Sequence, residues 1–246
     1  MRRLKKLKNH LILFASGVPK RMVNRKAPAF PIYIFHHIPK CGGASTLRIL
    51  SHWFIMIGDN RIGWSARYPE PVDLKRLNSA YCLYGHFDLD GYHLFERYPE
   101  VVGNPDFRLI TFLRDPLSVK LSLYRYEREH GRTSMTLEEH LFKNYLANIF
   151  PVTNENYEEV LDQYFFVGVT ESLPECMHYL AGVLNKKCPN IPVLNRTNTD
   201  SRQFASLTSE IVKRFRSENS LDYAIYDYAC RRMRETLSLA GVNTTS

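Results

Sequence analysis

The sequence predicts an α/β protein with a central parallel β-sheet flanked by helices. Short apolar runs at residues 32–36, 80–85, 107–113 and 165–169 alternate with longer segments that have helical periodicity, which is the pattern of βαβ units. The runs are apolar almost throughout, as is typical of parallel strands that are covered on both faces. The chain has 246 residues, 44% of them hydrophobic, and is long enough to bury one sizeable core.

The first predicted strand, 32–36, leads into a loop at 37–43 and then into a helix from about 44 to 57. We predict this helix because apolar residues recur at helical spacing. Its apolar stripe consists of Leu47, Leu50, Phe54 and Ile57. Residues 58–79 contain many Gly, Pro, Asp and Asn residues, which indicates a surface excursion before the second strand.

The middle of the chain carries the clearest helix-start signals. Asp115 and Pro116, which follow the third strand, are predicted to cap and begin a helix that runs to about Glu129. Residues 136–139, Thr-Leu-Glu-Glu, have the pattern of a capping box. We therefore predict that another helix begins there and continues to about residue 145.

The last third of the chain is predicted to be mostly helical. A short helix at 156–163 precedes the fourth strand, and a helix at about 173–184 follows it. Two more helices, at about 207–217 and 221–239, close the chain. Together these elements predict one folded domain at residues 31–242.

Charge is concentrated in the N-terminal segment, 1–30, which we predict to be a basic arm. The formal net charge is +8, but the first 26 residues hold nine of the 33 Lys and Arg residues and no Asp or Glu. The rest of the chain has 24 basic against 25 acidic residues, which argues against a surface that coats nucleic acid. The arm is either a solvated tail or a segment attracted to an anionic membrane or polymer. Its apolar run at 11–18 is too short for a spanning helix, which needs about 20 residues.

The five cysteines are scattered along the chain, and none belongs to a C-x-x-C pair. Their odd number and loose spacing argue against a disulfide scaffold and against a zinc site. We therefore expect the protein to work in a reducing compartment.

Residues 37–46 have the composition of a phosphate-binding loop. They follow a predicted strand, contain Lys40 and the pair Gly42 and Gly43, and lead into a predicted helix. Glycines let the backbone curl around an anion, a helix start offers N–H groups, and the lysine adds a charge. In the common nucleotide-triphosphate loop the lysine follows the glycines and a Ser or Thr beside it binds Mg²⁺, whereas Lys40 precedes them. The alternative is an ordinary strand-to-helix turn.

Arg114 and Ser122 form the second candidate anion site. Arg114 directly follows a predicted strand, and Ser122 lies two helical turns further on, so both side chains can reach one anion. Arginine offers a rigid donor fork that suits a phosphate group. The alternative is that Arg114 pairs with a neighbouring carboxylate.

Together, the two segments resemble the sulfotransferases that use 3′-phosphoadenosine 5′-phosphosulfate (PAPS), in particular the carbohydrate branch that contains the uronosyl 2-O-sulfotransferases and their bacterial relatives. The family's loop reads approximately His-x-Pro-Lys-x-small-small-(Ser/Thr)-Ser and is matched by residues 37–46. Its second segment reads Arg-Asp-Pro-x-x-Arg-x-x-Ser and is matched by Arg114, Asp115, Pro116 and Ser122. The family's second arginine falls at Val119, and Lys120, the nearest basic residue, is turned away from that position by about 100° on a helix.

The resemblance implies the nucleotide-kinase-like P-loop sulfotransferase fold and a PAPS site. Lys40 and the loop amides would hold the 5′-phosphosulfate, while Arg114 and Ser122 would hold the 3′-phosphate. Residues 167–171 resemble a strand-end segment near the adenosine, and Arg196 falls in a late polar loop that closes over the nucleotide. The cofactor-binding residues implied in this way are Lys40, Cys41, Gly42, Gly43, Ala44, Ser45, Thr46, Arg114, Ser122 and Arg196.

The resemblance also implies two catalytic residues, His86 and Lys40. His86 directly follows the second strand, and a glycine leaves room beside it; such strand ends are where α/β sheets place reactive groups. The family's histidine at this place acts as the base, and its lysine meets the charge of the leaving phosphate. The alternative is a structural histidine, with Asp88 as the next candidate base. His36 and His37 are adjacent on a strand and point to opposite sides, so we do not expect them to form a metal pair.

We therefore expect in-line transfer of the sulfuryl group from PAPS to a hydroxyl of a carbohydrate acceptor, either a polysaccharide or a glycolipid. Adenosine 3′,5′-bisphosphate would be the other product, no metal would take part, and nucleic acid is not an expected partner. The alternatives are a nucleotide or small-molecule kinase of related fold, and a non-catalytic protein that binds nucleotide or glycan. We expect a cytoplasmic protein, peripheral to a membrane if the basic arm binds lipid; the alternative, for a eukaryotic protein, is the Golgi membrane.

Overall fold

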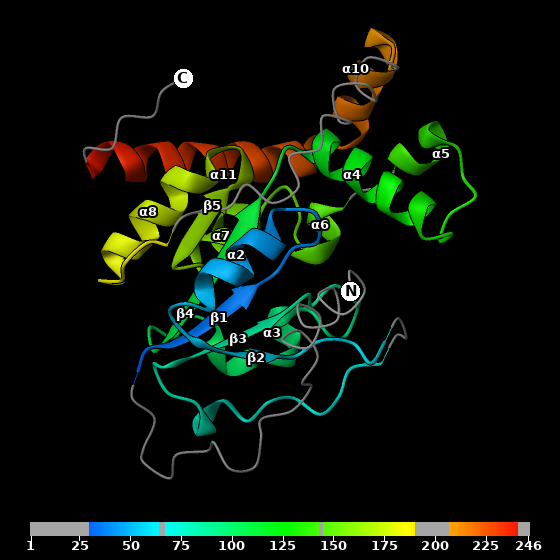
Figure 1. The fold of residues 1–246 in the computed structure, drawn as a ribbon. Helices are drawn as coiled ribbons and strands as arrows, with labels where there is room; N and C mark the ends of the chain where they lie inside the picture. The colour runs from blue at the N-terminus through cyan, green and yellow to red at the C-terminus, as the bar shows by residue number, and fades with distance from the viewer. Residues whose placement is uncertain (1–29, 64–66, 143–144, 190–206, 241–246) are drawn as a thin grey trace, which may run out of the picture.

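The computed structural model describes residues 30–63, 67–142, 145–189 and 207–240, which form a parallel sheet with helices around it (Figure 1). Within these ranges, five strands pair in parallel in the order β2-β3-β1-β4-β5. The strands are β1 (Ile32–His36), β2 (Ile55–Gly58), β3 (Tyr81–Gly85), β4 (Phe107–Leu113) and β5 (Phe166–Val169). The predicted fold class is confirmed.

The central strand β1 lies between β3 and β4, and its last residue belongs to the edge where the candidate site residues lie. His36 is opposite Gly85 of β3 and Thr111 of β4. The hydroxyl of Thr111 donates to the carbonyl oxygen of His36 at 2.9 Å, which ties the ends of two strands together. Because all strands run in the same direction, the loops that follow β1, β3 and β4 leave from one edge of the sheet.

The helix that follows β1 is shorter than the sequence predicts, and this is a correction. Helix α2 (Gly43–Leu50) ends at Leu50, and the last residues that were expected to belong to it, 55–57, form most of strand β2. There Ile55 pairs with Tyr81 of β3, and the N–H of Ile55 donates to the carbonyl of Ala80 at 2.8 Å. A short apolar run fits a helix and a strand equally well, and in this case pairing with a distant strand decides the outcome.

Helix starts follow the local capping chemistry. The carboxylate of Asp115 accepts from the N–H of Ser118 at 2.8 Å at the start of α4, and Thr136 and Glu139 form the predicted capping box at the start of α5. The remaining helices are α3 (Leu94–Arg97), α4 (Pro116–Glu129), α5 (Leu137–Leu141), α6 (Leu146–Ile149), α7 (Tyr157–Asp162), α8 (Leu173–Val183), α10 (Ser209–Glu218) and α11 (Ser220–Leu239). Single 3₁₀ turns lie at Leu74–Arg76, Pro99–Val101 and Thr170–Ser172. The helix predicted to reach residue 145 instead ends at Leu141, and α3 was not predicted.

The helices enclose a main core around the sheet and a second, smaller core beside it. The long helix α11 packs against β5, with α8 next to it (Figure 1). A separate cluster joins α4, α5 and α10, which lie together at the right of Figure 1. Its buried members are Leu117, Leu121, Leu141 and Phe215.

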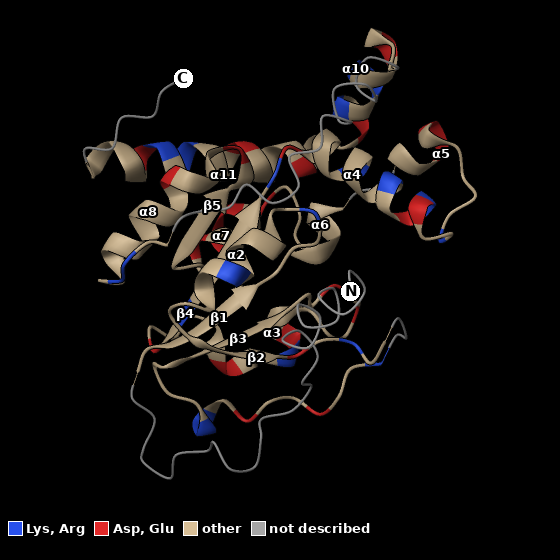
Figure 2. Cartoon of the chain, in the orientation of Figure 1, with Lys and Arg blue, Asp and Glu red and all other residues tan. Residues whose placement is uncertain are grey.

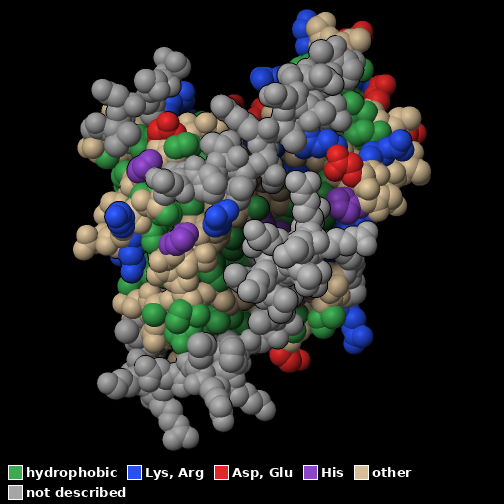
Figure 3. Space-filling view, in the orientation of Figure 1, with side chains coloured by type: hydrophobic (Ala, Val, Ile, Leu, Met, Phe, Trp, Pro, Cys, Tyr) green, Lys and Arg blue, Asp and Glu red, His purple; other side chains and the backbone are tan. Residues whose placement is uncertain are grey.

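Basic and acidic residues are interspersed over the described elements (Figure 2), in agreement with the balanced charge of the chain after its first 26 residues. Among the described residues on the face shown in Figure 3, the basic side chains are likewise dispersed. Residues 1–29 of the basic arm and Arg196 lie outside the described residues. In the part of the chain that is described, no helix combines the length and the apolar character needed to cross a membrane.

A buried carboxylate on α11 fixes the segment that supports the loop after β1. Asp222 is 1% exposed and accepts from the N–H groups of Tyr145, Leu146 and Ala147 at 2.9, 3.1 and 2.9 Å. The hydroxyl of Tyr145 in turn donates to the carbonyl of Pro39 at 3.2 Å. Asp222 therefore caps α6 and indirectly holds the loop after β1.

Replacing Asp222 by alanine is expected to lower the free energy of unfolding by about 3 kcal/mol, because three N–H groups, two of them in buried hydrogen bonds, lose their acceptor. Urea unfolding followed by circular dichroism measures the change. Asp227→Ala is the matched control on the same helix, because Asp227 is exposed and its removal should change stability by less than about 0.5 kcal/mol. Equal stability of the two variants would contradict the capping role.

Candidate functional site

The loop after β1 has the backbone of an anion-binding turn. Lys40 and Gly42 both adopt left-handed conformations, with φ of 68° and 73°. Such a φ is costly for a lysine, and strain of this kind collects at functional sites. Gly42 is the N-cap of α2 and no side chain caps this helix. The N–H groups of the first helical residues, Gly43 and Ala44, therefore point out of the helix start, where an anion is favoured.

Two neighbouring segments pack against this loop so closely that its glycines cannot be replaced freely. A Cβ on Gly42 would lie 3.2 Å from Cγ2 of Thr170, and a Cβ on Gly43 would overlap the ring of His37. Thr170 is itself fixed by donation from its hydroxyl to the carbonyl of Leu113 at 2.9 Å. The two glycines of the loop are thus held between the ring of His37 and Thr170, which follows β5.

Arg114 and the face of α4 that carries Ser122 both lie beside the loop. Nη1 of Arg114 donates to the carbonyl of Lys40 at 3.5 Å. Ser122 is buried, and its hydroxyl makes no hydrogen bond to a described residue. Tyr126 lies one turn after Ser122 on the same face of α4, and the ammonium of Lys40 is 4.6 Å from the centre of its ring. The structure therefore brings Lys40 and Arg114 together, and it places the part of α4 that carries Ser122 and Tyr126 beside Lys40.

The side chain of His86 is oriented by the loop itself. Nδ1 of His86 lies 2.7 Å from the carbonyl oxygen of His37, and the centres of the two rings are 4.5 Å apart. A carbonyl can only accept, so Nδ1 carries the proton and Nε2 keeps its lone pair. Burial lowers the pKa of His86 from its usual 6.5, against the opposing effects of the His37 carbonyl and the charge of Asp88. His86 is therefore neutral at pH 7 and offers a basic nitrogen.

The backbone around His86 is closely confined. A Cβ on Gly85 would overlap the carbonyl oxygen of Asp59, so only a glycine allows the ends of β2 and β3 to approach in this way. Phe87, which follows His86, has a φ of 48°. A bulky residue with this φ is strained, and the surrounding contacts must therefore hold it in place.

Asp88, the second candidate base, is engaged by two other side chains. One carboxylate oxygen accepts from Nη2 of Arg61 at 2.9 Å, and the other accepts from the hydroxyl of Tyr68 at 3.3 Å. Asp88 and Arg61 lie near His86, where their charges act on its pKa in opposite directions. In this arrangement Asp88 is placed to influence the pKa of His86.

The two residues at the position of the expected second arginine are both buried on α4. Val119 belongs to the main core, and Lys120 is 4% exposed. An arginine side chain at 119 would have to enter that core.

Sequence reasoning assigned no role to Tyr126, although its spacing of four residues from Ser122 places both on one helix face. It likewise assigned none to the carbonyl of His37, because backbone acceptors have no sequence signal.

Comparison with known proteins gives similarities to two sulfotransferase structures. A sulfotransferase from Alicyclobacillus acidocaldarius is 16% identical, with a TM-score of 0.45, and the match covers 77% of this chain and 95% of that one. The mouse sulfotransferase SULT7A1, complexed with PAP, is 11% identical, with a TM-score of 0.47, and the match covers 82% of this chain and 91% of that one. No protein-family model matches the chain, and no curated protein matches it.

Proposed function

We propose that this protein transfers the sulfuryl group of PAPS to a hydroxyl of a carbohydrate acceptor. One observation supports this proposal most: the loop carrying Lys40 contacts both Arg114 and His86. Its carbonyl groups accept from Nη1 of Arg114 at 3.5 Å and from Nδ1 of His86 at 2.7 Å. A donor with two anionic ends and a proton-accepting nitrogen can therefore meet at one edge of the sheet.

In this proposal the two anionic ends of PAPS are held by separate groups. The first N–H groups of α2 and the ammonium of Lys40 bind the 5′-phosphosulfate, because a helix start and a lysine both favour an anion. Arg114 and the hydroxyl of Ser122 bind the 3′-phosphate, for which the planar guanidinium offers two parallel donors. Ser122 fits this role because its hydroxyl has no other partner among the described residues.

The chemical step is an in-line displacement at sulfur. The acceptor oxygen forms a bond to sulfur while the bond from sulfur to the 5′-phosphate oxygen breaks, and adenosine 3′,5′-bisphosphate leaves. Nε2 of His86 takes the proton of the acceptor hydroxyl. Lys40 and the loop amides meet the negative charge that develops on the departing phosphate oxygen.

Radiolabelled PAPS, incubated with the pure protein and a panel of polysaccharides and glycolipids, tests this proposal. The expected result is label on at least one carbohydrate, together with adenosine 3′,5′-bisphosphate in equal amount. A parallel reaction with ATP labelled on its γ-phosphate tests for a kinase. Phosphate transfer from ATP in the absence of sulfuryl transfer from PAPS would contradict the proposal.

The pH dependence of the reaction is expected to report His86. The active form is the neutral imidazole, so activity is lost as the pH falls through the pKa of His86. Because burial lowers that pKa below 6.5, the acidic limb of kcat/KM should lie below pH 6.5 and activity should be retained at neutral pH. A pH profile measured with saturating and subsaturating acceptor checks this. If the acidic limb lies above pH 6.5 and every His86 variant retains it, the assignment of His86 as the base is contradicted.

A further inference from the structure

A chain of hydrogen bonds leads from Tyr164 through the buried ring of His36 to the backbone of His86. His36, the last residue of β1, is 0% exposed. Its Nε2 lies 3.0 Å from the carbonyl oxygen of His86, and its Nδ1 lies 2.7 Å from the hydroxyl of Tyr164. Because the carbonyl can only accept, Nε2 of His36 carries the proton and Nδ1 accepts from the hydroxyl.

This pattern of donors and acceptors is fixed because His36 stays neutral. Its ring is packed against those of Phe87, Phe150 and Tyr164, with centres 5.6, 5.3 and 6.1 Å away. Burial among these rings lowers the pKa of His36 to about 3. His36 therefore donates to His86 at every pH at which the protein would act.

The carbonyl that His36 holds belongs to a strained part of the backbone. It joins His86 to Phe87, whose φ of 48° is unfavourable for an aromatic residue. His36 both donates to this peptide group and packs its ring edge against Phe87. If the N–H donor of His36 were lost, the peptide between His86 and Phe87 would be free to rotate toward a relaxed conformation. Nδ1 of His86 would then move away from the carbonyl of His37.

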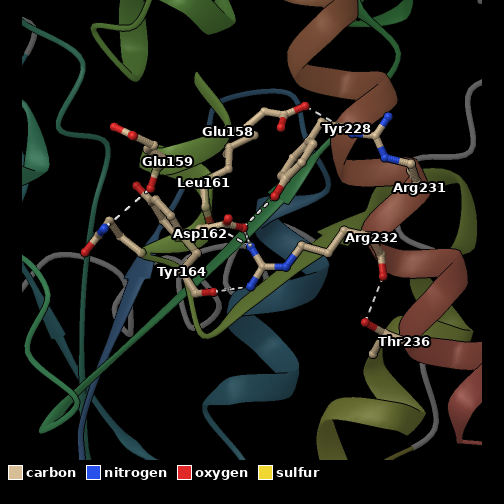
Figure 4. Close-up of polar contacts among 10 residues, drawn as sticks. Glu158, Glu159, Leu161, Asp162, Tyr164, Tyr228, Arg231, Arg232 and Thr236 are labelled. Carbon is tan, nitrogen blue, oxygen red and sulfur yellow. Dashed lines mark hydrogen bonds and ion pairs between the residues drawn. The ribbon is translucent and has the colours of Figure 1, made fainter. Parts of the chain in front are cut away.

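Tyr164 is anchored in turn by the last helix of the chain. Nη2 of Arg232 donates to the carbonyl of Tyr164 at 2.6 Å, and Nη1 donates to the carbonyl of Leu161 at 2.6 Å (Figure 4). Nη1 also lies 3.5 Å from the carboxylate of Asp162. Arg232 therefore holds the end of α7 and the segment that begins β5, and with it the position of the Tyr164 ring.

We propose that His36, supported by Tyr164, is a positioning residue for His86: its N–H holds the backbone of the base so that Nδ1 reaches the His37 carbonyl and Nε2 faces the acceptor. The effect on turnover rests on the proposed function, because it requires His86 to be the base. The effect on the geometry of His86 does not depend on the proposed function.

The test compares His36→Leu, which fills the space without a donor, with His36→Gln, whose amide N–H can reach the same carbonyl. The first readout is the tautomer and titration of His86 by ¹H–¹⁵N NMR of the imidazole. The second is kcat and KM for PAPS. The leucine variant should lose the uniform Nδ1–H tautomer of His86 and about tenfold or more of kcat, with KM unchanged, because a small misplacement of a reacting group is costly. The glutamine variant should recover most of both.

Two tyrosine variants complete the experiment and keep the test conclusive if the leucine variant does not fold. Tyr164→Phe removes only the hydroxyl that His36 accepts from, and it should broaden the tautomer distribution of His86. Tyr228→Phe is the matched control, because its hydroxyl bonds to Asp162 at 2.6 Å on the same side of the protein without contacting His36. The other titratable groups that face His86 are His37, Asp88 and Arg61, and every variant retains them.

The outcomes separate the two proposals. A folded His36→Leu variant with the wild-type tautomer of His86 would overturn the positioning role, whatever its activity. A changed tautomer with unchanged kcat would also overturn it, since the orientation would then not matter for the reaction. If the wild-type protein shows no sulfuryl transfer but His36→Leu still alters the tautomer of His86, the positioning is supported and the proposed function is contradicted.

Discussion

Replacement of His86 by alanine is expected to lower the turnover of sulfuryl transfer by a factor of about 10²–10⁴, the usual contribution of a general base. The affinity for PAPS should change little, because the imidazole is not among the groups assigned to the nucleotide and makes its hydrogen bond to the His37 carbonyl through Nδ1. Steady-state kinetics give the turnover, and calorimetry gives the affinity.

His178→Ala is a suitable control for this experiment. His178 is an exposed histidine on α8, and its Nδ1 bonds to the carbonyl of Pro174 within the same helix. This variant should keep wild-type kinetics. An alanine variant at His86 that retains most of its turnover would show that the base is assigned wrongly, and Asp88 would then be the next residue to replace.

The second large effect is expected at Lys40. Lys40→Ala should lower turnover by roughly 100-fold, since one preorganised donor to a developing charge is worth about 3 kcal/mol. PAPS binding should weaken at the same time, because the ammonium also faces the charge of the bound donor. The combined loss distinguishes Lys40 from His86, whose removal should affect turnover alone.

Lys75→Ala controls for the loss of a positive charge, because Lys75 is exposed in the turn at Leu74–Arg76. A Tyr126→Leu variant adds a further comparison, since the ring of Tyr126 lies 4.6 Å from the ammonium of Lys40 and should help to hold it. Unchanged kinetics and binding in Lys40→Ala would remove the assignment of the loop to the phosphosulfate.

The parts of the fold that sequence reasoning predicted well are those set by local chemistry. The run 107–113 became β4 because it is apolar apart from Arg108 and Thr111, and Asp115 and Thr136 mark the starts of α4 and α5 through their own side chains. Strand β2 was mistaken for the end of a helix because its state depends on pairing with β3, some 25 residues later. No local pattern carries that information.

The same distinction applies to the candidate site. Lys40, Arg114 and His86 could be identified because Arg114 and His86 directly follow strands and Lys40 lies in the loop after β1, and parallel strands bring such residues to one edge of the sheet. The contact between His36 and Tyr164 joins residues 128 positions apart, and the acceptor for His86 is a backbone carbonyl. Neither contact produces a recognisable sequence pattern, so only the structure could show what holds His86 in place.

Isothermal titration calorimetry with adenosine 3′,5′-bisphosphate tests the central claim most directly, because it requires neither the acceptor nor the chemical step. We predict saturable binding at one site, weaker binding of adenosine 5′-monophosphate, and reduced affinity for the bisphosphate in Ser122→Ala, since Arg114 and Ser122 are assigned to the 3′-phosphate. A well-folded wild-type protein that produces no heat with the bisphosphate would contradict the account.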